Sequence, residues 1–183
     1  MLLYRVFPYL RDARGNEPGH PLYANQAQGS GRWDNPGLYS AFYLAKSPEA
    51  AIGEAFGNLL TWTPAMFASP VLKGAERSLC AYDFDEAKSP LIDFDDPGVL
   101  CEREIRPTHV VICNRPRTQK LAAEIYGEGK WSGICWWSHH LPEWGLVVLF
   151  GAARLTVVGV EQVAGQAAFG DAAVALSKLC KGF

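Results

Sequence analysis

The sequence has no long apolar run and no excess of positive charge. No stretch approaches the roughly 18 apolar residues that a membrane-spanning helix requires, and the apolar start of the chain, MLLYRVFPYLRD, is too short for a signal peptide. The 17 lysine and arginine residues face 19 aspartate and glutamate residues, a formal net charge of −2. Non-specific nucleic-acid binding depends on basic residues that neutralise phosphates. We therefore expect a cytoplasmic protein that binds neither a membrane nor nucleic acid directly, so that an anionic ligand would need a local arginine cluster.

The common metal and nucleotide motifs are also missing. The sequence contains no CxxC pair, no GxGxxG turn after a strand and no GxxxxGK[ST] loop. These absences argue against a Rossmann site and exclude a P-loop. The spacing of the cysteines is not that of metal ligands and indicates reduced thiols, so we expect neither a metal nor a prosthetic group. The five cysteines are Cys80, Cys101, Cys113, Cys135 and Cys180.

What is present is typical of a globular protein. Apolar residues make up 49% and charged residues 20% of the 183 residues, enough for one domain over residues 1–183 with its own core. Short apolar runs outnumber helical patterns, which favours an α+β fold with a mixed or antiparallel β-core flanked by helices. A long loop is predicted over 11–37. Strands are predicted over 2–9, 38–45, 79–84, 91–94, 108–113, 134–137, 146–150 and 155–160. Helices are predicted to begin after Ser47, after Thr118 with an end near Gly127 or Gly129, and after Asp171 with Val174, Leu176 and Leu179.

The helix after Ser47 carries an unusual acidic face. Ser47-Pro48-Glu49 is typical of a helix start, and Ile52, Ala55, Phe56 and Leu59 then form an apolar stripe. Glu54 lies nearly opposite this stripe, beside Gly53 and Gly57. Each interior glycine costs about 0.8–1 kcal/mol relative to alanine. Either Glu54 is a surface charge with incidental glycines, or a ligand or chain segment approaches this face closely.

Two further residues within the same stretch suggest ligand binding. Arg32 lies in the glycine-rich segment GSGRWDNPG, where a guanidinium and backbone N–H groups can hold an anion; the alternative is a solvated loop arginine. Tyr43, at the end of its predicted strand, offers an aromatic face to a flat ring or packs in the core. An anion binder, an aromatic ring and a carboxylate therefore follow one another within 23 residues.

This stretch resembles the RES-domain family. The segment GRW, followed by Tyr-Leu-Ala-x-Ser-Pro-Glu-x-Ala-x-x-Glu, is similar to the first half of the family pattern. Arg32, Tyr43 and Glu54 match the family's arginine, tyrosine and glutamate. Ser138, in WSGICWWSHHLPEWGLVVLF, matches its serine better than Ser132 does. The Trp136-Trp137 pair and His139-His140 depart from the pattern. The resemblance covers residues 2–160 and leaves 161–183 as a helical extension.

The resemblance implies a fold similar to ADP-ribosyltransferases and NAD as substrate. Many members are toxins that deplete NAD and are neutralised by an Xre-type antitoxin. It also implies a role for each matched residue. Breaking the nicotinamide–ribose bond develops positive charge on the ribose, which the carboxylate of Glu54 would stabilise. Arg32 would bind the pyrophosphate, and Tyr43 would form a wall for the nicotinamide. Ser138 would hydrogen-bond the carboxamide or orient Glu54, since no base is identified that would make it a nucleophile.

Several alternatives stay open in the sequence. Trp33, Trp136 and Trp137 either wall the adenine or pack in the core. His139 and His140, if extended, point to opposite faces and form no joint metal site. The chain is an NAD glycohydrolase or phosphorylase, an ADP-ribosyltransferase with a protein target, or a non-catalytic interaction domain. A homo-oligomer is a further alternative for the assembly.

Overall fold

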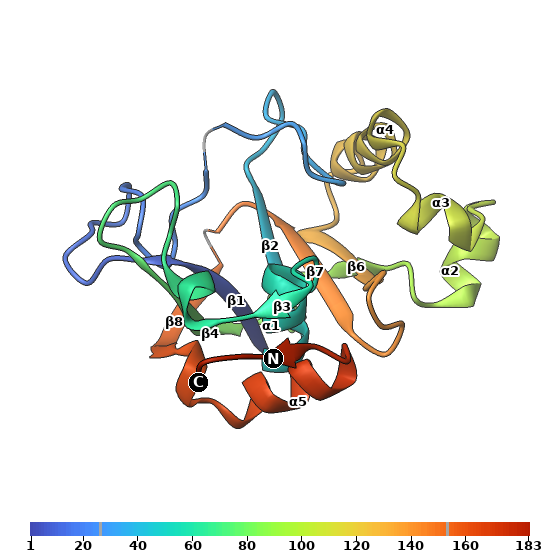
Figure 1. The fold of residues 1–183 in the computed structure, drawn as a ribbon. Coiled ribbons are helices and arrows are strands. Elements are labelled where there is room, and N and C mark those ends of the chain that lie inside the picture. The colour runs from blue at the N-terminus through green and yellow to red at the C-terminus, as the bar shows by residue number, and fades with distance from the viewer. Residues whose placement is uncertain (26, 153) are drawn as a thin grey trace. The chain divides into compact units, whose positions relative to one another are not determined.

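The computed structural model describes residues 1–25, 27–152 and 154–183, whose strands and helices fall into two units (Figure 1). Unit 1 comprises Met1–Tyr23, Ala45–Phe84 and Leu155–Phe183, and unit 2 comprises Ala24–Leu44 and Asp85–Arg154. Both units combine strands with helices, and the pairing is mixed, with parallel and antiparallel neighbours. The predicted α+β class with a mixed β-core and flanking helices is therefore confirmed. Within the described ranges no helix is long and apolar enough to cross a membrane.

The sheet of unit 1 is built around β4 (Glu76–Phe84). This strand pairs antiparallel with β1 (Leu2–Tyr9) and with β8 (Leu155–Gln162) (Figure 1). The register shifts between Ala81 and Tyr82, so that Val158 of β8 is passed over by the pairing. Such a bulge bends an edge strand and disfavours pairing with a further chain.

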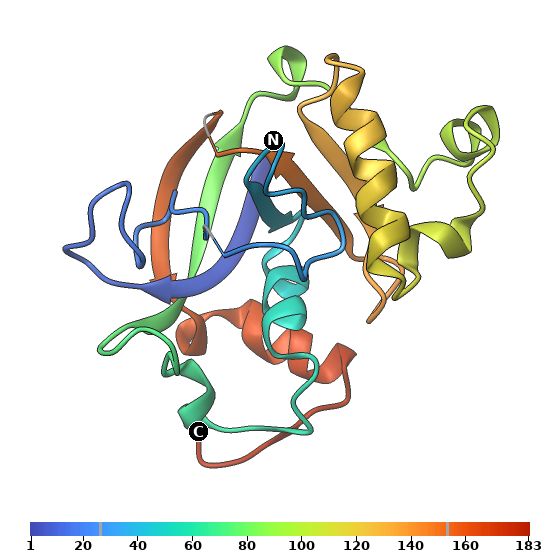
Figure 2. The ribbon, with the colours of Figure 1, turned by 90° about the horizontal axis from the view of Figure 1, so that it is seen from above.

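The helices of unit 1 pack around an aromatic cluster. α1 (Pro48–Phe56) and α5 (Ala167–Ala175) contact each other and lie side by side in Figure 2. The side chain of Ser47 accepts a hydrogen bond from the N–H of Ala50, as predicted for the N-cap. The ring centroids of Phe56, Trp62, Phe67 and Phe169 lie 5.2–6.1 Å from their neighbours. The remaining elements are β3 (Thr61–Trp62), β9 (Leu179–Cys180) and the 3₁₀ helices Pro64–Phe67 and Val163–Gly165.

Unit 2 holds the other strands in the order β5-β6-β7-β2. β5 runs parallel to β6, and β6 antiparallel to β7. A parallel pair needs a crossover connection, and here the chain makes it through three consecutive helices (Figure 1). The elements are β2 (Ala41–Ala45, whose last residue belongs to unit 1), β5 (Leu91–Asp93), β6 (Gly133–Trp137), β7 (Gly145–Phe150), α2 (Pro97–Glu102), α3 (Pro107–Val111), α4 (Arg115–Gly127) and the 3₁₀ helix Glu86–Lys88.

The long loop before β2 supplies core residues to unit 2. Its described residues form no helix or strand, as predicted for 11–37. Trp33 is fully buried and packs against Phe94 and Trp136, with ring centroids 6.0 and 5.6 Å away. The ring centroids of Tyr39 and Tyr126 lie 4.9 Å apart. The loop is therefore anchored by its own aromatic residues.

One predicted strand is wrong. Residues 108–113 read as β because Val110, Val111 and Ile112 are β-branched, yet the segment forms α3. Pro107 stands at the first helical position, where its fixed φ favours a helical turn. One turn is enough to bury Val110 fully. The predicted strand over 38–45 begins later, at Ala41, and the others coincide with observed strands to within a few residues.

Two predicted helix caps are also wrong. Asn114, and not Thr118, caps α4 and accepts a hydrogen bond from the N–H of Arg117. Asp171 lies inside α5, which begins at Ala167, and Leu179 belongs to β9. The sequence patterns predicted both helices. In each case, however, the residue predicted as the N-cap lies about one turn after the position where the helix begins.

The helix of Glu54 is shorter than its pattern suggested. α1 ends at Phe56, and Gly57 is its C-cap with φ −59°. Only Gly53 is therefore an interior glycine of this helix. Ile52 and Phe56 are buried as predicted, but Leu59 lies beyond the helix and is 41% exposed.

Candidate functional site

Arg32 is held by the end of a helix. Its Nη1 donates hydrogen bonds to the carbonyl oxygens of Val110, at 2.9 Å, and Ile112, at 2.6 Å. These carbonyls lie at the C-terminal end of α3, where helix carbonyls lack internal donors and attract cations. The contacts orient the guanidinium, which argues against the alternative of a solvated loop arginine.

A buried carboxylate, Asp34, ties the loop of Arg32 to Tyr43. Asp34 is only 5% exposed. Its Oδ2 accepts hydrogen bonds from the N–H groups of Gly29, at 2.8 Å, and Gly31, at 2.7 Å, and its Oδ1 accepts from the hydroxyl of Tyr43 at 2.7 Å. A Cβ at Gly31 would lie 2.5 Å from both Asp34 Oδ1 and the Tyr43 hydroxyl oxygen. Glycine is therefore required where the loop passes this pair.

Tyr43 is fixed at its hydroxyl and is half-buried as a residue. The hydroxyl oxygen also accepts from the N–H of Trp33 at 2.9 Å, and the ring packs edge-on against Trp136 at 6.3 Å. Burial, and then the neighbouring carboxylate of Asp34, raise the pKa of the Tyr43 phenol well above its ordinary value of 10. The phenol therefore stays neutral and donates a hydrogen bond to Asp34.

The other side of the same loop is bound by α4. Gln119 Nε2 donates to the carbonyl oxygens of Gly29 and Gly31, both at 2.9 Å. The hydroxyl of Thr118 donates to the carbonyl of Arg32 at 2.6 Å. Gly29 and Gly31 are thus hydrogen-bonded at both their N–H and their C=O groups. This arrangement leaves the loop little conformational freedom.

Ser138 directly follows β6 and is 1% exposed. Its N–H donates to the carbonyl of Trp144 at 2.8 Å, and its Oγ accepts from the N–H of His140 at 2.9 Å. Ser132, the weaker match, lies before β6, at the opposite end of the strand. The structure therefore separates the two serines by the length of one strand.

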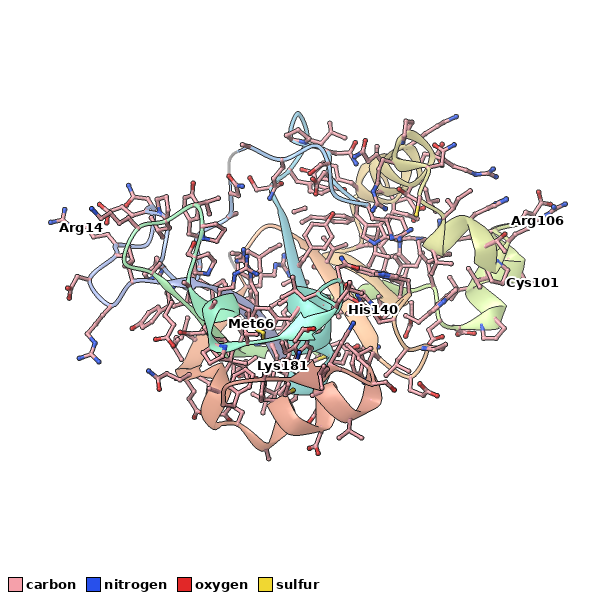
Figure 3. All side chains as sticks on the ribbon, in the orientation of Figure 1. Arg14, Met66, Cys101, Arg106, His140 and Lys181 are labelled. Atoms are coloured by element: carbon pink, nitrogen blue, oxygen red, sulfur yellow. The ribbon has the colours of Figure 1, made fainter. Side chains whose placement is uncertain are left out.

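The expectation that His139 and His140 point to opposite faces of an extended segment is wrong. The ring centroids of His139 and His140 lie 3.9 Å apart, with an angle of 38° between the rings. Figure 3 labels His140. The chain bends here and is not extended, so adjacent side chains no longer alternate between faces. The bend is also where the Oγ of Ser138 binds the N–H of His140.

The tryptophans belong mainly to the core. Trp33 is fully buried and Trp136 is 6% exposed, and they pack against each other. Trp137 is half-buried. For Trp33 and Trp136 the structure thus favours the core alternative over a wall for adenine.

Three of the four predicted site residues lie in unit 2. Arg32 and Tyr43 are joined through Asp34 and the backbone of Trp33. Ser138 follows β6 two residues after Trp136, whose ring contacts Tyr43. Glu54 lies on α1 of unit 1, half-buried and next to the buried Gly53.

Sequence reasoning missed Asp34, Thr118 and Gln119. Asp34 stands in D-N-P-G, a combination that reads as a simple turn. Gln119 lies 88 to 90 residues from the glycines it binds, and no local pattern reports a contact of that range. The burial of Asp34, which marks a paired carboxylate, is visible only in the folded chain.

Comparison with known proteins supports the resemblance. The model of the RES domain matches residues 2–169. The crystal structure of the M. tuberculosis MbcT–MbcA toxin–antitoxin complex contains a chain similar in fold, with a TM-score of 0.60 at 20% identity over 87% of this chain and 81% of that one. No curated protein matches the sequence. At such low identity the structural likeness concerns the fold, while the family match spans nearly the whole sequence. The chain therefore belongs to the RES domain family.

Proposed function

We propose that this protein is an NAD-consuming enzyme that cleaves the nicotinamide–ribose bond, working as one catalytic domain over residues 1–183. The observation that carries the proposal is the fixed pair of Arg32, in the loop, and Tyr43, on β2, two family-matched residues that Asp34 and the backbone of Trp33 join. An oriented guanidinium suits a pyrophosphate, and a half-buried aromatic ring suits nicotinamide.

In the proposed reaction the bond between the ribose C1′ and the nicotinamide nitrogen breaks, and its electron pair goes to nicotinamide. Nicotinamide leaves neutral and needs no strong general acid. The carboxylate of Glu54 stabilises the positive charge that develops on the ribose. A water molecule or a phosphate ion then attacks C1′, and the attacking water releases a proton to solvent. Ser138 hydrogen-bonds the carboxamide or orients Glu54.

We further propose that the protein is the toxin of a toxin–antitoxin pair in the cytoplasm. The family match and the toxin–antitoxin complex named for the similar structure support this. An Xre-type antitoxin is the proposed protein partner, and neither nucleic acid nor a membrane is expected to bind directly. A second copy of the chain is a further candidate partner.

The test uses the purified protein with NAD alone, in buffer with and without phosphate. We expect rapid release of free nicotinamide in the absence of any protein target. ADP-ribose as the other product identifies water as acceptor, and a phosphorylated ADP-ribose that forms only in phosphate identifies phosphorolysis. Nicotinamide release only after a target protein is added would instead establish an ADP-ribosyltransferase. No NAD binding and no turnover would contradict the proposal and favour an interaction domain.

A further inference from the structure

We propose that Asp34 is a positioning residue for NAD binding, which acts by holding the loop of Arg32 and the hydroxyl of Tyr43 in one fixed arrangement. This inference rests on the proposed function, because it assumes that Arg32 and Tyr43 contact NAD. Asp34 itself is 5% exposed and already accepts three hydrogen bonds, so it acts through its neighbours and not on the ligand.

The geometry requires a carboxylate at this position. Both oxygens of Asp34 face donors only: Oδ2 faces the N–H groups of Gly29 and Gly31, and Oδ1 faces the Tyr43 hydroxyl. An ionised carboxylate is the one side-chain group of this size that accepts at both ends. In asparagine one end becomes an NH₂ donor. It either opposes the two glycine N–H groups or turns the Tyr43 hydroxyl, which already accepts from the N–H of Trp33, from a donor into an acceptor and removes the charge.

Losing this contact should affect the site more than the fold. The loop keeps other anchors when Asp34 changes, namely Gln119 and Thr118 on its carbonyl groups and the fully buried ring of Trp33. Asp34 supplies the charged link between the loop and Tyr43, beside the hydrogen bond that the N–H of Trp33 donates to the same hydroxyl. Without it we expect the Arg32 loop and the Tyr43 ring to occupy several arrangements, of which only a fraction binds NAD well.

The experiment compares Asp34→Asn with Asp96→Asn in NAD cleavage and in thermal unfolding. Asp96 is a matched control: it belongs to the same unit, its Oδ1 accepts from the N–H of Gly98 at 2.7 Å, and it is exposed at the start of α2. For Asp34→Asn we expect KM for NAD to rise about 10-fold with kcat within about 2-fold of the unchanged protein, because a loss of ground-state binding raises KM alone. Asp96→Asn should leave both constants unchanged.

A double-mutant cycle separates positioning from general stability. Each single variant, Arg32→Lys and Asp34→Asn, raises KM by some factor. If Asp34 acts through Arg32, the double variant should raise KM by less than the product of these two factors. Full additivity would overturn the proposal, as would an unchanged KM for Asp34→Asn. Should Asp34→Asn fail to fold, Tyr43→Phe decides, since it removes only the hydroxyl: a KM equal to that of the unchanged protein would overturn the proposal. An unchanged protein that neither binds nor cleaves NAD would instead refute the proposed function itself.

Discussion

At the residue scale, most of the polar contacts that hold the Arg32 loop run from side chains to the backbone. Arg32, Thr118 and Gln119 bind carbonyl groups, and Asp34 binds N–H groups of glycines. Such bonds fix a loop without requiring a helix or strand, because they satisfy backbone groups that would otherwise need water. A loop held in this way can present a side chain to a ligand at little entropic cost.

Arg32→Lys tests the binding role of the arginine. Lysine keeps the charge but loses the planar fork, so NAD binding should weaken. An arginine that is solvated in its loop would change the melting temperature little. The bonds to Val110 and Ile112 now predict a decrease of a few degrees, since each bond contributes about 1 kcal/mol and about 1 kcal/mol shifts Tm by roughly 2–4 °C in a chain of this size. Calorimetric titration with NAD and thermal unfolding measure the two effects.

The control for this substitution is Arg106→Lys. Arg106 lies in the same unit and is exposed next to α3, as Figure 3 shows. It should leave both NAD affinity and melting temperature unchanged. Equal NAD affinity for Arg32→Lys and the unchanged protein would remove Arg32 from the site.

Glu54→Gln tests the electrostatic role of the carboxylate. The variant keeps the shape of the side chain, so α1 should form as before, while NAD cleavage should fall by about 10²–10³, the usual loss for one preorganised electrostatic contact. Glu49→Gln, in the first turn of the same helix, is the control and should cleave NAD normally. Nicotinamide release measured on both variants decides, and a normal rate for Glu54→Gln would contradict the mechanism.

At the element scale, two helices of unit 1 each contain one interior glycine in different surroundings. Gly53 of α1 is buried, whereas Gly170 of α5 is exposed and a Cβ there would meet nothing within 4 Å. Helix propensity favours alanine over glycine by up to about 1 kcal/mol at either position. The difference between the two sites therefore isolates the effect of the surroundings.

Gly170→Ala should raise the melting temperature, and Gly53→Ala should not. At Gly53 the added methyl group has to fit a buried position beside Glu54, so we expect lost stability or lost NAD cleavage despite the better propensity. Thermal unfolding and nicotinamide release are measured for both variants. If Gly53→Ala were as stabilised as Gly170→Ala and fully active, the glycine beside Glu54 would be incidental.

The ends of α2 and α4 are joined by an ion pair that predicts a pH dependence. Arg103, which follows α2, contacts Glu128, which follows α4, at 2.6 Å. The hydrogen bond from Arg103 is the main cause that lowers the pKa of Glu128 from 4.5 to about 2. A carboxyl group with a lowered pKa stabilises the fold fully above its unfolded pKa, and this contribution is lost as the pH falls from about 4.5 to about 2.

Glu128→Gln should therefore flatten the acid limb of the stability curve. Its melting temperature should lie below that of the unchanged protein at pH 7 and approach it near pH 2. Glu124→Gln is the control, because Glu124 is exposed and lies 3.9 Å from Lys120 in a weaker pair. If the difference in melting temperature between the unchanged protein and Glu128→Gln stayed the same from pH 7 to pH 2, the ion pair would contribute nothing to the pH dependence of stability.

At the scale of the whole molecule, elements with local signals were predictable and long-range partners were not. The run Leu2–Tyr9 and the Ser47-Pro48-Glu49 start carry their own pattern, and both are observed as predicted. α3 was mistaken for a strand because five residues are too few to show a helical period. Of the candidate site, the family pattern singled out Arg32, Tyr43, Glu54 and Ser138, while Asp34 and Gln119 emerged only from the folded chain.

The sequence by itself determined the α+β class, most strand positions and membership of the RES domain family. Alternation of apolar residues, proline and serine at helix starts, and motif spacing act over a few residues and survive without knowledge of contacts. Only the tertiary structure decided that Arg32 is oriented by the end of α3, and that Asp34 and Gln119 hold one loop from its two sides. Hydrogen-bond partners 78 to 90 residues apart are chosen by how the elements pack, and no local rule of sequence encodes that choice.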